Sequence, residues 1–147
     1  QVRTAAQAAQ ADGFIQSFQE SYDTMLGHSG SNLSGGQRQR VAIARALIKK
    51  PKILILDDCL SAVDALTEAS IRDALAEEAH KRGLLIISQK ISSILDCDRI
   101  VVLDDGVCDG VGTHKELLQS SQVYRDIYAS QYGREALAQA VCGREAL

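Results

Sequence analysis

The chain has 147 residues, 46% of them hydrophobic and 24% charged, with a formal net charge of −3 at pH 7. This length is enough for one globular domain. Lysine and arginine are scattered rather than massed, which argues against a nucleic-acid-binding surface. No apolar run approaches the ~20 residues that span a bilayer, and no basic-then-apolar leader is present, so we expect a soluble, cytosolic segment.

The first part of the sequence predicts two helices separated by a loop. Residues 5–18 are rich in alanine and glutamine, which predicts a short helix that Gly13 weakens. A loop rich in glycine, serine and asparagine is expected at residues 27–33. From Ser34 onward apolar side chains recur at helical spacing, and Pro51 halts that pattern.

Two unbroken apolar runs of strand length follow, at residues 53–56 and 84–87. Runs of this kind indicate strands covered on both faces, as in a parallel sheet. Between them, residues 64–80 predict the helix that crosses from one parallel strand to the next.

The last part of the sequence predicts a hairpin and then a helix. Residues 99–103 and 107–111 flank an Asp-Gly turn, which is a recognised hairpin signal. Thr113 and Glu116 offer a capping box for the helix that follows. The order strand, helix, strand, hairpin, helix predicts an α/β fold with parallel strands and flanking helices.

Four cysteines form no CxxC pair and have no histidine at metal-ligand spacing. A zinc site or a disulfide framework is therefore not expected, and the prediction is four reduced thiols. They are Cys59, Cys97, Cys108 and Cys142.

The helix that begins at Ser34 has a start suited to anions. Ser34 can cap the helix, and Gln37 stands where a capping box needs it. Gly35 and Gly36 leave backbone N–H groups unshielded, and a helix N-terminus favours negative charge. From these residues alone, an ordinary capped helix end is an equally good interpretation.

Three motifs in order are more specific than that helix start. Residues 34–45 read Ser-Gly-Gly-Gln-Arg-Gln-Arg-Val-Ala-Ile-Ala-Arg, residues 53–58 read Ile-Leu-Ile-Leu-Asp-Asp, and residues 61–64 read Ser-Ala-Val-Asp. This order closely resembles the signature, Walker B motif and D-loop of the nucleotide-binding domain of ABC transporters of the exporter type.

The resemblance implies a head-to-tail dimer in which the signature of one domain closes on ATP held by the Walker A loop of the other. Ser34, Gly35, Gly36 and Gln37 would then meet the γ-phosphate of the ATP that the partner holds. Asp64 would lie in the D-loop and span the dimer, and it is also well placed to cap the next helix.

The resemblance also assigns the acidic pair and a switch residue, with two departures from the family pattern. Asp57 would organise Mg²⁺ through water. Asp58 replaces the usual glutamate that polarises the attacking water, and its side chain is shorter by one C–C bond. Gln89 replaces the usual histidine, and an amide cannot carry a proton or a charge.

These two departures beside an intact signature favour a heterodimeric exporter. In that interpretation the Walker B motif of this chain serves the weak ATP site, and its signature serves the competent one. The alternative is tolerated drift in a homodimer that hydrolyses ATP slowly.

The likeness also sets expected boundaries. Residues 1–132 would be a partial nucleotide-binding domain, with residues 1–33 ending its helical subdomain and residues 34–132 running from the signature to the C-terminal helices. Residues 133–147 would form a tail, expected as a poorly ordered helix, in which Gly-Arg-Glu-Ala-Leu occurs twice.

The motif Gly-x-x-x-x-Gly-Lys-Ser/Thr, whose amides and lysine cradle phosphates, does not occur in the sequence. We therefore expect that the chain alone neither binds ATP tightly nor hydrolyses it, and that ATP and Mg²⁺ need a P-loop from outside it. Two functions stay open. One is part of the ATPase of an exporter, at the cytoplasmic face of a membrane beside transmembrane domains; the other is a non-catalytic module that docks on an intact ABC ATPase.

Overall fold

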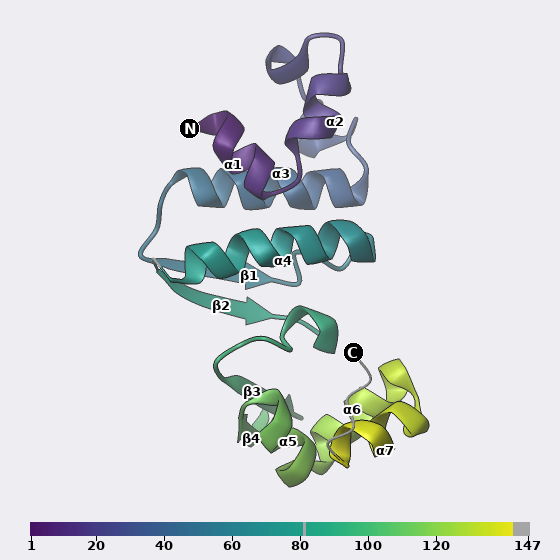
Figure 1. Cartoon of the computed structure of the whole chain (residues 1–147). Helices are drawn as coiled ribbons and strands as arrows, with labels where there is room; N and C mark the ends of the chain where they lie inside the picture. The colour runs from purple at the N-terminus through teal and green to yellow at the C-terminus, as the bar shows by residue number, and fades with distance from the viewer. Residues whose placement is uncertain (81, 143–147) are drawn as a thin grey trace. The chain divides into compact units, whose positions relative to one another are not determined.

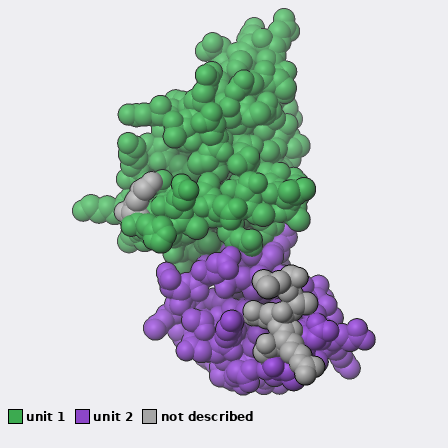
Figure 2. All heavy atoms as spheres, viewed as in Figure 1, with its two compact units in different colours: residues 1–88 green, residues 89–147 purple. Residues whose placement is uncertain are grey.

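A computed structural model describes residues 1–80 and 82–142, and the chain forms two compact units. The first unit comprises residues 1–88 and the second begins at residue 89 (Figure 2). Figure 1 shows the helices and strands of the chain. Each unit has a hydrophobic core of its own. The buried apolar side chains are divided between these two cores, and the domain boundaries expected from the sequence stay a prediction.

The first unit opens with short helices that lead to one long helix. Residues 5–18 do not form the expected single helix, because the backbone turns left-handed at Gln10, with φ of +53°. The long helix confirms its prediction, since Ser34 caps it and it ends before Pro51. The elements are α1 (Val2–Ala8), α2 (Asp12–Ser17), η1 (Ser21–Asp23), η2 (His28–Gly30) and α3 (Gly35–Ile48).

Two parallel strands and their connecting helix complete the first unit, as the sequence predicted. Strand β1 (Ile53–Asp57) leads through α4 (Ala65–Ala79) to β2 (Gly83–Ile87). The strands pair in register from Ile53 with Gly83 to Asp57 with Ile87. The carboxyl ends of both strands therefore lie at the same edge.

Among the described residues of this unit, helices cover one face of the strand pair and not the other. Leu54 and Leu56 of β1 are buried in a core that α1, α3 and α4 also supply. The side chains of the other face are between 49% and 66% exposed; they are Ile53, Ile55, Leu85 and Ile87. The prediction of strands covered on both faces is wrong for this unit, because its core lies against a single face.

The second unit is a hairpin with helices. The expected turn is confirmed, and Asp105 and Gly106 both have positive φ, at +46° and +78°, as a two-residue type I′ turn requires. The predicted capping box of Thr113 and Glu116 is also present. The elements are η3 (Ile91–Ser93), β3 (Ile100–Asp104), β4 (Val107–Gly112), α5 (His114–Ser120), α6 (Gln122–Tyr132) and α7 (Arg134–Val141).

The core of the second unit gathers six buried side chains from η3, β3, α5 and α6. They are Ile91, Ile100, Val102, Leu117, Leu118 and Tyr124. Helix α7 lies in the predicted tail, and the second Gly-Arg-Glu-Ala-Leu, at residues 143–147, lies outside the described residues.

Candidate functional site

The start of α3 presents a capping box and two amides without partners. The Ser34 hydroxyl accepts from the Gln37 backbone N–H at 3.2 Å, and the Ser34 N–H donates to the Gln37 side chain at 2.9 Å. Within the described parts of the chain, no acceptor is bonded to the amides of Gly35 and Gly36. Those two N–H groups therefore lie at the positive end of the helix dipole, an arrangement that fits a phosphate or another anion.

The acidic pair, Asp57 and Asp58, lies at the carboxyl end of β1. Asp57 is the last residue of the strand, and the Asp58 N–H donates to the Ile87 carbonyl of β2 at 2.9 Å. Asp58 has φ of +45°, in the left-handed region that aspartate tolerates better than most residues. Both side chains are exposed. The edge of the strand pair therefore offers two carboxylates to solvent, and the backbone turns away from the sheet at the second.

The loop after Asp58 is bound to α3 by the side chain of Gln39. The Gln39 amide nitrogen donates to the Asp58 carbonyl at 3.3 Å and to the Ser61 hydroxyl at 3.0 Å. Its oxygen accepts from the Ala62 N–H at 3.0 Å. The Ser61 hydroxyl donates in turn to the Asp58 carbonyl at 3.0 Å. One side chain thus holds three groups of the loop.

The same loop lies directly against the glycines of α3. A Cβ on Gly36 would stand 2.7 Å from the Ala62 carbonyl oxygen, closer than real Cβ contacts. A Cβ on Gly35 would meet the Ala62 Cβ at an ordinary 3.5 Å. Glycine at position 36 is therefore required by the close approach of two main chains. The structure thus brings Ser34–Gln37 together with the loop that carries Asp58 and Asp64.

Asp64 closes this loop as the N-cap of α4. Its carboxylate accepts from the Thr67 backbone N–H at 3.0 Å. Hydrogen bonds from the backbone and then the side chain of Thr67 lower the pKa of Asp64, and the charge of Arg40 acts in the same direction. The capping role that the sequence allowed for Asp64 is therefore present.

Gln89 lies in the second unit, where its backbone is held by Gln131 of α6. The Gln131 side chain donates to the Gln89 carbonyl at 2.7 Å and accepts from the Ile91 N–H at 3.0 Å. The Gln89 side chain itself is exposed. Because Gln89 and Asp58 belong to different units, their grouping in one site stays a prediction.

The donor set fits a magnesium ion shared with phosphate better than an ion held by protein alone. Among residues 1–80 and 82–142, no group of three or more His, Cys, Asp or Glu side chains is placed to hold a metal. Mg²⁺ usually keeps waters and binds one or two carboxylates together with substrate phosphates. Asp57 can supply one such carboxylate.

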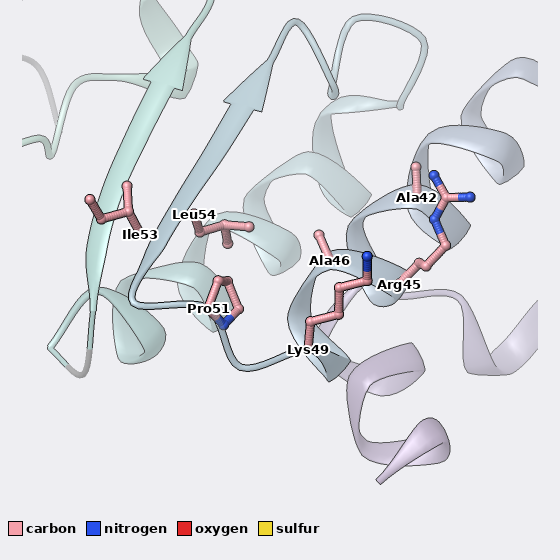
Figure 3. A pocket seen from close by; sticks show the side chains of 7 residues that line it. All are labelled: Ala42, Arg45, Ala46, Lys49, Pro51, Ile53 and Leu54. Carbon is pink, nitrogen blue, oxygen red and sulfur yellow. The ribbon is translucent and has the colours of Figure 1, made fainter.

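A shallow hollow in the first unit lies away from these residues. It is lined by the C-terminal half of α3 and the start of β1 (Figure 3). Ser34 and Asp57 stand at the opposite ends of those elements. Its lining residues are Ala42, Arg45, Ala46, Lys49, Pro51, Ile53 and Leu54.

In the described ranges, no helix is long and apolar enough to cross a membrane.

Comparisons with known proteins agree on one family. A family model described as ABC transporter matches residues 1–61. An uncharacterized ABC transporter ATP-binding protein of Bacillus subtilis, YfiB, is 49% identical over 135 residues, which cover 92% of this chain and 23% of that protein. An ATP-dependent lipid A-core flippase of Hahella chejuensis is 44% identical over 132 residues, covering 90% of this chain and 23% of the flippase.

The fold of the chain matches part of a solved exporter. A bacterial Atm1-family ABC exporter with ATP bound matches with a TM-score of 0.85 and 41% sequence identity, over 88% of this chain and 23% of that one. The chain thus spans about a quarter of the length of these relatives. The predicted α/β fold of an ABC ATPase fragment is confirmed.

Proposed function

This chain belongs to the ABC transporter family, as part of its ATP-binding domain, and we propose that it contributes to the ATPase that drives a membrane exporter. In this proposal the chain pairs head to tail with a second nucleotide-binding domain at the cytoplasmic face of a membrane, beside transmembrane domains. The names of its relatives, which include an Atm1-family exporter and a lipid A-core flippase, support this assignment.

The observation that carries the proposal is the start of α3. Ser34 and Gln37 satisfy one another, which leaves the amides of Gly35 and Gly36 pointing out of the helix end. These amides bind the γ-phosphate of ATP that the partner holds, and the helix dipole favours that charge. Helix geometry fixes both donors before the ligand arrives, so little ordering is needed on binding.

The acidic pair acts on a second ATP, which needs a P-loop from outside these 147 residues. Asp57 orients Mg²⁺ and its waters from the end of β1. Asp58 stands where the attacking water is polarised, but its side chain is short, and a displacement of ~1 Å can cost ~100-fold in rate. Bound Mg²⁺–ATP supplies the phosphoryl group and the charge neutralisation for the reaction.

We also propose that the two ATP sites of the dimer are unequal. Asp58 and Gln89 weaken the site that they serve, because the shorter carboxylate stands farther from the water and the amide of Gln89 neither takes up a proton nor carries a charge. The signature face serves the other site, whose remaining residues come from the partner. The parent assembly is accordingly a heterodimer.

The test mixes the purified chain with an intact ABC nucleotide-binding domain that has its own P-loop, with and without Mg²⁺ and a fluorescent ATP analogue. We expect nucleotide to bring the two proteins together, and the chain alone to show no saturable binding at micromolar ATP. Ser34→Arg should weaken pairing by about 30-fold or more, as for a residue at the centre of an interface.

The matched control is Ser130→Arg, which places the same side chain on an exposed position of α6. This variant should pair as the wild-type chain does. If the wild-type chain does not pair with the intact domain, the proposed role of the signature face is wrong. It is also wrong if Ser34→Arg and Ser130→Arg pair equally well.

A further inference from the structure

Gln39 uses both functions of its amide to hold one loop. Its nitrogen donates to the Asp58 carbonyl and the Ser61 hydroxyl, and its oxygen accepts from the Ala62 N–H. Two of these three partners are main-chain groups, so the contact holds the path of the loop and not only the direction of a side chain. Gln39 as a residue is partly buried, and its three hydrogen bonds are exposed to solvent.

This contact joins two surfaces with different tasks in the proposed function. Ser34–Gln37, one turn before Gln39 on α3, face the ATP that the partner holds. Asp58, at the start of the loop, serves the ATP bound on the side of this chain. The Gln39 amide and the close approach of Gly36 to the Ala62 carbonyl lie between these two surfaces.

The two ends of the loop are also held by hydrogen bonds. At its start, the Asp58 N–H is bonded to the Ile87 carbonyl of β2, and the Asp58 carbonyl accepts from Gln39 and from Ser61. At its end, Asp64 is bonded to α4. Gln39 is the side chain that fastens the middle of the loop to the signature helix.

We infer that Gln39 is a positioning residue that couples the signature face, which meets the partner's ATP, to the loop 58–64. The inference rests on the proposed function and adds to it a route from that face to the loop. A displacement of α3 on binding the partner's ATP is transmitted to the Asp58 carbonyl and the Ala62 amide through one side chain.

The contact is tested first without a partner, by amide hydrogen exchange at Ala62. Gln39→Ala removes the acceptor, so exchange at Ala62 should become about 2- to 10-fold faster, as expected for one lost hydrogen bond. Gln39→Glu keeps an acceptor oxygen but has no N–H to donate, so it should preserve most of the protection at Ala62. Equal exchange rates in the wild type and Gln39→Ala would overturn the inference.

The coupling is tested by a double-mutant cycle on nucleotide-dependent pairing with the intact ABC domain described above. Ser34→Ala and Asp64→Ala are made singly and together, in the wild-type background and with Gln39→Ala. We expect the two effects to depart from additivity by about twofold or more in the wild-type background, and to become additive with Gln39→Ala. A role of Gln39 in stability alone would weaken pairing without changing this coupling.

The matched control is Gln139→Ala, the same substitution at an exposed position of α7, which should leave the coupling unchanged. Pairing with the same coupling in both backgrounds overturns the role of Gln39 and leaves the proposed function standing. If Ser34→Ala and Asp64→Ala show no coupling in the wild-type background, the role of Gln39 is likewise overturned and the proposed function stands. Absence of pairing by the wild-type chain overturns the proposed function, and this inference with it.

Discussion

Replacing Gly36 with alanine has two opposite effects on the free energy of unfolding: alanine favours the helix, but its Cβ clashes with the neighbouring loop. Alanine is the better helix former by up to about 1 kcal/mol. Its Cβ would lie 2.7 Å from the Ala62 carbonyl oxygen, 0.7 Å inside the 3.4 Å at which ordinary contact begins, and that oxygen belongs to the main chain. Overpacking of this kind costs about 1–3 kcal/mol. We expect the cost to win, with a net loss of about 1–2 kcal/mol in the free energy of unfolding.

The neighbouring glycine provides the control for this prediction. Gly35→Ala is the same change one residue earlier in α3, but its Cβ would meet only the Ala62 Cβ at 3.5 Å. We expect Gly35→Ala to be as stable as the wild type, or slightly more stable. Urea unfolding followed by circular dichroism measures both variants, and with a slope of about 2 kcal/mol per M the midpoint of Gly36→Ala should fall by about 0.5–1 M.

The comparison of the two variants decides whether the packing is as described. If Gly36→Ala unfolds at the same urea concentration as Gly35→Ala, the main chains of α3 and the loop do not approach closely. The requirement for glycine at position 36 would then have to come from ligand binding and not from the fold.

Two further predictions concern pH. The lowered pKa of Asp64, caused mainly by the Thr67 backbone N–H, means that its carboxylate stabilises the fold above the ordinary value of 3.8 and that this contribution is lost as the pH falls through the lower folded value. The stability advantage of the wild type over Asp64→Asn, measured by urea midpoints, should therefore shrink below about pH 4. Burial raises the pKa of Tyr124 from 10.0 to about 12. Spectrophotometric titration should therefore find one tyrosine that ionises at about 12 and is absent from Tyr124→Phe, while the wild type loses stability as the pH rises above 10.0.

Local signals in the sequence predicted the elements that depend on local chemistry. The helix from Ser34 is specified by its capping box and by Pro51, and the hairpin by its Asp-Gly turn, so both were predicted correctly. The break at Gln10 was not predicted, because glutamine has no special preference for a left-handed backbone. The apolar runs indicated strands but not how many faces helices would cover, since that depends on packing between distant segments.

The side chains that hold the site were harder to predict than its motifs. Gln39 binds groups 19 to 23 residues away, and Gln131 binds groups 40 and 42 residues away. Nothing in a single sequence distinguishes these glutamines from solvated ones on the same helices. Gln39 is partly buried, and this distinction became known only with the fold.

The contact between Gly36 and Ala62 has a consequence for how this family is compared across species. The atom that approaches Gly36 is a main-chain carbonyl, which every amino acid at position 62 would provide. Two of the three bonds of Gln39 likewise end on main-chain atoms. A main-chain atom cannot be exchanged by substitution, so correlated substitutions in alignments would not report these three contacts. Of these four contacts, only the hydrogen bond between Gln39 and Ser61 joins two side chains. Only this pair of positions can show correlated substitutions.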